Sequence, residues 1–144
     1  MARLTLDQAN AIADKAIEKR RSSGGRPIAV AVLDAGGHLK VLKREDDASF
    51  FRPEIAFGKA WGAVAMGEPS RTLREKAQQN PNFMTALAVA SGGKVVPNPG
   101  GVLIRDAKGA IMGAVGISGD TGDADEAFAV FGIEAVGLTA DRGA

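Results

Sequence analysis

The chain has 144 residues, which is enough for one domain with a hydrophobic core and too few for two ordinary domains. Apolar residues make up 45% and charged residues 24%, and 18 lysines and arginines against 17 aspartates and glutamates leave a net charge of +1. This balance predicts a folded globular protein without the strong positive field that attracts nucleic acid. We therefore expect a single domain over residues 1–144 and no nucleic-acid partner.

Cysteine and tyrosine are absent, and His38 is the only histidine. A disulfide framework, a zinc–thiolate centre and an iron–sulfur cluster are excluded because they need cysteine. The longest apolar runs, such as residues 29–33, are too short to cross a bilayer, and residues 1–4 do not begin an apolar signal sequence. These features favour a cytoplasmic protein with no membrane partner.

The first third of the chain predicts a helix followed by a β-hairpin. Residues 5–8 (Thr-Leu-Asp-Gln) have the spacing of a capping box, apolar residues then recur at helical spacing, and Gly24-Gly25 ends the helix. An apolar run at residues 28–33 and a segment of mixed apolar and charged residues at 38–45 flank a turn at residues 34–37 that contains glycine. This pattern is typical of two antiparallel strands.

The rest of the chain predicts four helices and three strands. They are a helix from Pro53 to Gly67, a helix opened by a capping box at residues 72–75 and ending at Gln79, a helix from Asn80-Pro81 to Gly92-Gly93, a brief strand at Val95-Val96, a hairpin of residues 102–105 and 110–118, and a last helix that begins at residues 123–126 and includes Leu138. Two hairpins separated by helices favour an antiparallel sheet with helices packed on it, an α+β fold.

Four motifs, in this order, resemble the GlcG/HbpS-like family over about residues 4–137. They are VAVLDAGGHL at residues 30–39, IAFGKA at 55–60, PNPGGV at 97–102, and GAVGISG at 113–119 followed by Asp125-Glu126. The resemblance implies a profilin-like fold, with a five-stranded antiparallel sheet and helices on both faces. It also implies a homo-oligomer, either a dimer or a larger ring.

The same resemblance implies a small-ligand-binding module. Some members of the family bind haem, and a similar domain follows the adenosyltransferase domain of some corrinoid-modifying proteins, whose activity is not carried over to this chain. The expected ligand is haem or a related planar carboxylated molecule. Two positions depart from the pattern: Leu103 stands where many relatives have proline, and Gly62 replaces a threonine whose hydroxyl could have faced a ligand.

Two side chains carry the expected chemistry, and each has a structural alternative. His38 could coordinate haem iron or move a proton, because imidazole titrates near neutrality, or it could be a turn residue bonded to a neighbouring carbonyl. Met66, Met84, Met112 or a lysine are the other candidate axial donors. Lys59 could place its ammonium at a pocket mouth beside a haem propionate, or it could snorkel with its stem on the core.

The remaining candidates provide shape rather than charge. Besides His38 and Lys59, the expected ligand-binding residues are Phe50, Phe51, Gly62, Pro99, Gly100, Gly101 and Ser118. The phenylalanines could wall an apolar pocket, and the glycine turn could offer backbone N–H groups to a carboxylate. Gly58 and Gly62 lie four apart on one helix and predict the close approach of a flat ligand, another backbone or a second subunit. Core packing and strand connection are the structural alternatives.

Two other functions are consistent with the same residues. A small-molecule enzyme, such as an isomerase, tautomerase or hydrolase, would use Lys59 to hold a catabolic organic acid and His38 to move a proton. A structural assembly protein would use the smooth face of Gly58 and Gly62. The acidic residues between Asp120 and Glu126 either stabilise a helix N-terminus or form a weak metal site. We favour the binding module, which requires His38 and Lys59 to line one cleft.

Overall fold

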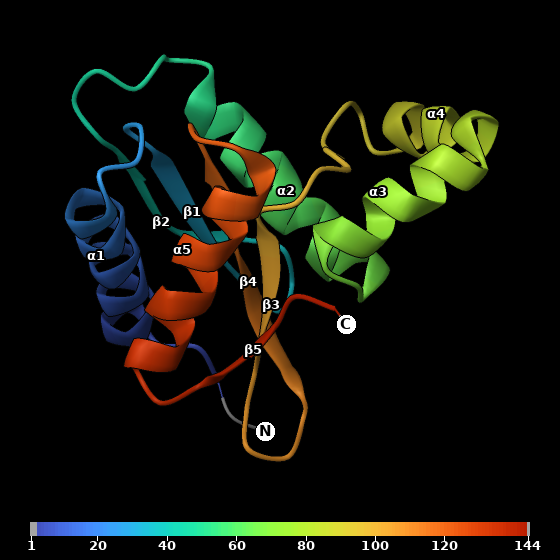
Figure 1. The fold of residues 1–144 in the computed structure, drawn as a ribbon. Coiled ribbons are helices and arrows are strands. Elements are labelled where there is room, and N and C mark those ends of the chain that lie inside the picture. Colours follow the sequence, from blue (N-terminus) through green and yellow to red (C-terminus); the bar gives the residue numbers. More distant parts are fainter. Residues whose placement is uncertain (1–2, 144) are drawn as a thin grey trace.

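The structure is a computed structural model and describes residues 3–143. Its elements are α1 (Leu6–Ser23), β1 (Ala29–Asp34), β2 (Leu39–Arg44), α2 (Arg52–Met66), α3 (Ser70–Gln79), α4 (Pro81–Ala90), β3 (Gly101–Arg105), β4 (Ile111–Ser118), α5 (Gly122–Ala135) and β5 (Thr139–Asp141). The strands form one antiparallel sheet in the order β2-β1-β4-β3-β5. Helices α1 and α5 cover one face and α2 covers the other (Figure 1). The predicted α+β, profilin-like arrangement is confirmed.

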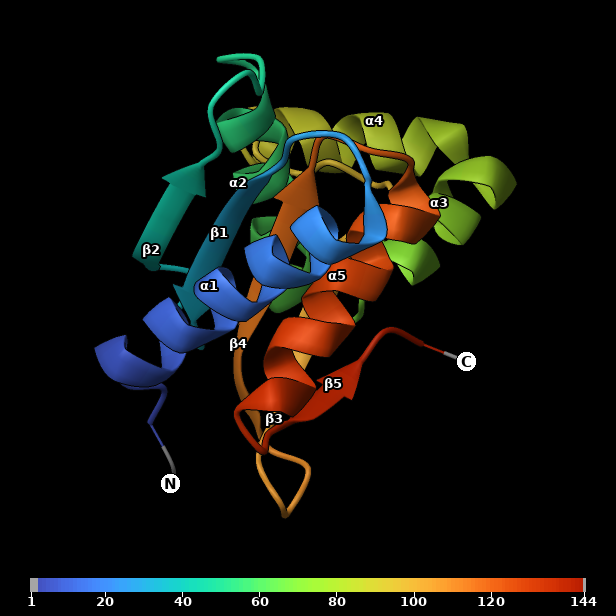
Figure 2. The same cartoon turned by 60° about the vertical axis from the view of Figure 1, so that its left-hand side comes forward.

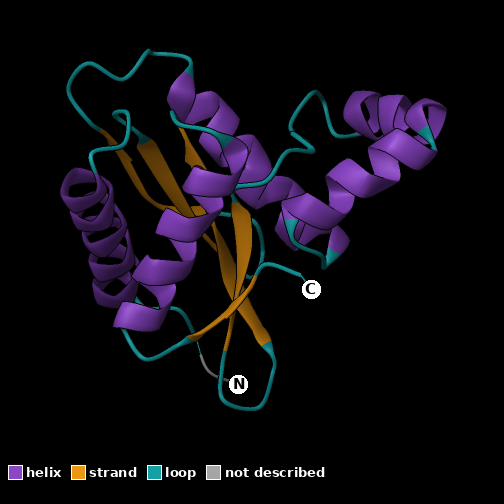
Figure 3. Cartoon of the chain, in the orientation of Figure 1, coloured by secondary structure: helices purple, strands orange, loops and turns teal. Residues whose placement is uncertain are grey.

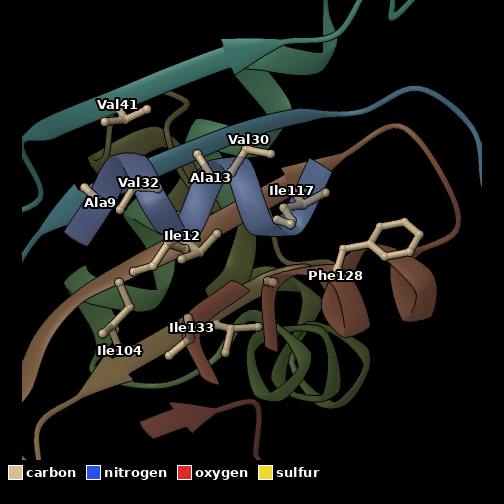
Figure 4. Packing of buried hydrophobic residues seen from close by; sticks show 14 of the residues in the cluster. Ala9, Ile12, Ala13, Val30, Val32, Val41, Ile104, Ile117, Phe128 and Ile133 are labelled. Carbon is tan, nitrogen blue, oxygen red and sulfur yellow. The ribbon is translucent and has the colours of Figure 1, made fainter. Parts of the chain in front are cut away.

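The larger part of the core lies between the sheet and the pair α1–α5, which run side by side in Figure 2. The capping box of α1 forms as predicted, because the Thr5 hydroxyl accepts a hydrogen bond from the Gln8 N–H and the Gln8 side chain accepts one from the Thr5 N–H. Ile12 and Ile133, one from each helix, are fully buried against the sheet (Figure 4). Each such side chain contributes about 1.5–3 kcal/mol through removal from water.

Part of the opposite face of the sheet is made of small residues, and there α2 packs close to the backbone of β1 and β4. Ala29 and Ala31 of β1 face α2 together with Gly116 of β4. A Cβ atom at Gly116 would collide with the carbonyl oxygen of Ala56. Gly116 of β4 therefore leaves room for the backbone of α2.

Helices α3 and α4 form an arm that projects away from the sheet (Figures 1 and 3). Leu73 of α3 and Met84 of α4 pack against Val95, and these residues hold the arm to the end of α2. The Asn80 side chain caps α4 by accepting a hydrogen bond from the Phe83 N–H, as predicted. Among residues 3–143, no helix has the length and apolar character that a bilayer span requires.

Three predicted elements are wrong in detail. The predicted capping box at residues 72–75 lies inside α3, which begins earlier, at Ser70. Val95 and Val96 form no strand. Their apolar side chains pack against α2 instead. The Val96 N–H also donates a hydrogen bond to the Gly58 carbonyl over 3.3 Å.

The strand missed by the sequence patterns is β5, which pairs with β3 at the edge of the sheet. Its three residues, Thr-Ala-Asp, have no apolar alternation, and Leu138 lies between α5 and β5 rather than inside the last helix. The α5 cap is also two residues earlier than expected, because the Thr121 hydroxyl accepts a hydrogen bond from the Ala124 N–H.

Candidate functional site

His38 lies where the turn between β1 and β2 ends, with its side chain 82% exposed. The Asp34 Oδ1 atom accepts hydrogen bonds from the backbone N–H groups of Gly36 at 2.9 Å and of His38 at 3.0 Å, and it lies 3.4 Å from His38 Nδ1. Burial raises the pKa of Asp34, but the two N–H groups and the imidazole outweigh it, so the pKa lies below its ordinary value. An ionised Asp34 thus orients the ring and leaves Nε2 free of this contact.

A cavity of about 360 Å³ lies beside this imidazole and is lined by Arg3, Leu4, Asp34, Ala35, Gly36, His38 and Met112. Leu4 and Met112 are almost fully buried and give the cavity an apolar base. The exposed Arg3 adds a guanidinium, the group best suited to bind a carboxylate. An imidazole, an apolar surface and a guanidinium are together able to hold a flat ligand that carries both a metal and an acid group.

Sequence patterns indicated His38 and Met112 but missed Asp34 and Arg3. The signal for Asp34 was present, because an aspartate before Gly-Gly is typical of a turn in which the carboxylate accepts backbone hydrogen bonds. No local pattern indicated Arg3, whose position beside His38 depends on where α1 begins relative to the sheet.

Lys59 does not lie at a pocket mouth. Its ammonium is buried, with 4% of the side chain exposed, and donates to the Ile117 carbonyl over 2.8 Å and to Asp125 Oδ2 over 3.3 Å. Burial lowers the pKa of Lys59 and the facing Asp125 carboxylate opposes this shift; burial also raises the pKa of Asp125. The snorkelling alternative is wrong as well, because the charged end points inward.

The predicted turn residues gather around Lys59 as packing elements. A Cβ atom at Gly100 would stand 2.8 Å from Lys59 Nζ, and one at Gly101 would collide with the Lys59 carbonyl. The Gly101 N–H donates to the Ser70 hydroxyl over 2.7 Å, and the Gly100 carbonyl accepts from the Ile117 N–H over 3.0 Å. These groups are used inside the fold, so the expected carboxylate-binding turn is a strand connection that lets Lys59 cross close to the sheet.

Ser118 and Pro99 lie in the same region. Ser118 is 1% exposed, and its hydroxyl accepts a hydrogen bond from Arg52 at the start of α2 over 3.3 Å. Pro99 is buried and faces Gly122 of α5. Neither side chain faces the cavity beside His38.

Within one chain, His38 and Lys59 do not line the same cleft. Asp34, four residues before His38, pairs with Gly113, whereas the carbonyl that binds Lys59 belongs to Ile117, beside the Ala29–Ser118 pair at the other end of β1. These pairs are five residues apart along β1, which corresponds to about 17 Å. The sequence motifs therefore combine two separate places in the fold, and the expectation of one cleft within the chain is wrong.

The candidate aromatic and helical residues also lie outside the His38 cavity. Phe50 and Phe51 directly precede α2, and their side chains are 84% and 56% exposed. Gly62 faces the side chains of Val95 and Leu73, so a threonine here would direct its hydroxyl into packing rather than toward the His38 cavity. Gly58 meets the Lys94 carbonyl, which confirms the close approach of another backbone.

The acidic residues near the start of α5 are partnered within the fold. Asp123 and Glu126 bind Arg71 of α3 at 2.5 and 2.9 Å, Asp125 binds Lys59, and Asp120 accepts backbone hydrogen bonds from Arg26 and Thr121. In the part of the chain that the structure describes, no three acidic or histidine side chains are arranged to hold a metal ion. Sequence patterns missed Arg71, which lies 55 residues before Glu126.

The strand order and the layering of the helices define a class of small α+β domains, and solved structures share it closely. The crystal structure of a PduOC–haem complex superposes with a TM-score of 0.86 at 28% identity, covering 97% of this chain and 99% of that one. The crystal structure of HbpS superposes with a TM-score of 0.82 at 31% identity, covering 95% and 92% of the two chains.

The chain belongs to the HbpS-like family, because the family's sequence model, described as "Haem degrading protein HbpS-like", matches residues 4–134. An uncharacterised 15.0 kDa protein from the dhaT–dhaS intergenic region of Citrobacter freundii is 27% identical over 90% of this chain and 89% of its own length. The corrinoid adenosyltransferase PduO of Salmonella typhimurium is 35% identical over 78% of this chain, and that match spans 33% of the relative. The resemblance found in the four motifs is thereby confirmed.

Proposed function

We propose that this chain is a haem-binding module in which His38 provides the nitrogen ligand of the iron. The observation that carries the proposal is the exposed His38 imidazole, oriented by Asp34 above a partly apolar cavity. Histidine, methionine, cysteine and tyrosine are the usual protein ligands of haem iron, and this chain lacks the last two. Membership of the HbpS-like family and similarity to a haem-bound structure support the same ligand.

The residues around the cavity fit the parts of a haem group. His38 would offer Nε2 to the iron, Leu4 and Met112 would contact the apolar macrocycle, and Arg3 would pair with a propionate. Of the candidate sulfur donors, Met112 lines this cavity, whereas Met84 packs in the α3–α4 arm. Bound haem would supply iron redox and ligand-exchange chemistry, and the chain would bind and orient it.

A homo-oligomer, either a dimer or a larger ring, forms part of this proposal. Large apolar side chains at Phe50, Phe51, Phe83 and Val89 are 49–84% exposed on the loop before α2, the start of α2 and α4. Exposed apolar surface of this kind is where contacts between protein chains commonly form. Contacts between copies would bury them, and native mass measurement would detect the assembly. Cytoplasmic location, expected from the sequence, stays a prediction.

Titration of the purified protein with hemin tests the proposal. We expect a shift of the Soret band at one equivalent, and at least about a tenfold loss of affinity in His38→Ala, because an axial ligand is removed. Lys40→Ala in the same hairpin is the matched control and should titrate like the wild type. A free-hemin spectrum at stoichiometric protein would overturn haem binding, and unchanged titration of His38→Ala would overturn the role of His38.

The enzymatic alternative loses its main support. Proton transfer to an acid held by Lys59 requires His38 and the ammonium in one site, and one chain holds them at opposite ends of β1. The Lys59 ammonium is already bound to Asp125 and Ile117. The haem-binding module is therefore the one function that we propose.

A further inference from the structure

A groove between α2 and the edge strand β2 has the properties of a second small-molecule site, distinct from the His38 cavity. We call it the α2–β2 groove; it encloses about 310 Å³ and is lined by Leu42, Pro53, Glu54, Phe57, Gly93 and Lys94. None of these residues lines the cavity beside His38. Pockets of about 300 Å³ and more, mainly apolar with a few polar groups, are typical ligand sites.

An irregularity in β2 explains why this groove is apolar. The register between β1 and β2 shifts between Val32 and Leu33, so Leu39 and Leu42 both lie on the α2 face of the strand. Their side chains remain 48% and 45% exposed. Edge strands ordinarily carry charged side chains that protect them from unwanted pairing. Two exposed leucines on this edge strand therefore favour contact with an apolar ligand.

Phe57 forms the aromatic part of the helical wall. Trp61 lies four residues further along the same face of α2, and both rings are half-buried. Trp61 lines a different cavity, of about 180 Å³, beside Gly37. Rings that are partly exposed on one face can stack on a flat ligand.

Two charges lie at the rim. The Lys94 ammonium stands 5.6 Å from the centroid of the Trp61 ring and donates one hydrogen bond, to the Ser91 carbonyl over 3.1 Å. Since an ammonium has three N–H donors, it retains the capacity to bind an anion. The exposed Glu54, in the first turn of α2, forms no ion pair among the described residues and offers its carboxylate to a donor.

We propose that the α2–β2 groove binds a small aromatic monocarboxylate whose ring carries a hydroxyl group. The ring would stack between Leu42 and Phe57, the carboxylate would pair with Lys94, and the hydroxyl would donate to Glu54. The negative charge of Glu54 disfavours a second carboxylate on the ligand. This charge pattern selects one class of acid and does not depend on haem binding.

Trp61 makes the site directly measurable. It is the only tryptophan in a chain without tyrosine, so the intrinsic emission at long wavelength reports on the ring that contacts Lys94 at the rim of the groove. Titration with 4-hydroxybenzoate should change this emission and broaden the ligand's own NMR signals. Lys94→Gln should weaken binding about tenfold, because a charge-assisted hydrogen bond is lost. Lys108→Gln, in the exposed turn between β3 and β4, is the control and should bind normally.

A second ligand pair tests the role of Glu54. Terephthalate, which has a carboxylate in place of the hydroxyl, should bind more weakly than 4-hydroxybenzoate, and Glu54→Gln should remove most of this difference. His38→Ala should leave both affinities unchanged. This last result separates the groove from the haem proposal, so either can fail while the other stands.

Four results would overturn the proposal. The first is no change of Trp61 emission or ligand NMR signals with 4-hydroxybenzoate, and the second is equal affinity in Lys94→Gln. The third is a groove covered by another copy: Leu42→Glu would then lower the native mass, and the wild-type oligomer would not bind the acid. Displacement of the acid by stoichiometric hemin would equally contradict a separate site.

Discussion

Lys59 and Asp125 form an ion pair between α2 and α5, with 3.3 Å between Nζ and Oδ2 and with 4% and 1% of their side chains exposed. The pair passes the end of β4, where the Ile117 carbonyl accepts from Lys59, and the Asp120 N–H donates to Asp125. It therefore joins helices from opposite faces of the sheet. The Ile117 carbonyl and the Asp120 N–H, which bind the two charged groups, offset part of the cost of removing both charges from water.

Removal of one partner of this pair should be strongly destabilising. Lys59→Met leaves the Asp125 carboxylate buried without its cation, and we expect the free energy of unfolding to fall by about 3–5 kcal/mol. Urea denaturation followed by circular dichroism measures the change. The double variant Lys59→Met/Asp125→Leu should lose less than the sum of the two single changes, because no lone charge remains.

A surface pair provides the control for this measurement. Lys15 and Glu18 of α1 are 3.3 Å apart and largely exposed, so Lys15→Met should change stability by less than about 1 kcal/mol. If Lys59→Met were as mild as Lys15→Met, the buried pair would have no structural role.

The two glycines of α2 should respond differently to alanine. At Gly58 an added Cβ atom would stand 2.6 Å from the Lys94 carbonyl and collide with Val96, so Gly58→Ala should destabilise by about 1–3 kcal/mol. At Gly62 the nearest atoms are side-chain methyl groups of Val95 and Leu73 at 3.2 and 3.3 Å. There the gain in helix propensity, about 1 kcal/mol, offsets mild crowding. Thermal unfolding of both variants decides whether the close contact is confined to Gly58.

Glu45 should account for part of the acid sensitivity of the fold. Burial raises its pKa, but the bound Arg20 guanidinium and the Ile28 N–H outweigh burial, so the folded-state pKa lies below the ordinary 4.5. The folded protein therefore holds fewer protons at this carboxyl than the unfolded chain. The resulting stabilisation is present above pH 4.5 and is lost as the pH falls through the folded-state pKa.

Stability curves against pH check this sign. Glu45→Gln should lower the stability near neutral pH and flatten the decline on the acid side. Glu18→Gln, which changes an exposed carboxylate of α1, should leave the shape of the curve unchanged. A steeper acid decline in Glu45→Gln than in the wild type would contradict the assignment.

Asp34→Asn should affect the orientation of His38 more than the fold. The amide oxygen can still accept both backbone hydrogen bonds of the turn, but it no longer carries the charge that attracts His38 Nδ1. We expect about a tenfold weaker affinity for hemin and a shifted Soret band, with a loss of stability below about 1–2 kcal/mol. An unchanged hemin spectrum and affinity would show that Asp34 only shapes the turn.

The sequence by itself determined much of the fold, because its local signals were strong. The capping box at Thr5, the Gly-rich turn after Asp34 and the cap at Asn80 each act over a few residues, and each forms as predicted. Apolar segments on either side of turns also indicated the four longer strands. It could not indicate β5, whose three residues become a strand only because the open edge of β3 lies beside them.

The arrangement of the candidate residues was decided by the tertiary structure alone. Motif positions placed His38 and Lys59 together, but the antiparallel register between β1 and β4 sends them to opposite ends of the sheet. Helical spacing could not show that Lys59 points inward, since that depends on Asp125, 66 residues away. Local hydrogen bonds and side-chain patterns fix elements, whereas charge pairing across the sheet and the register of its strands fix which residues can meet a ligand.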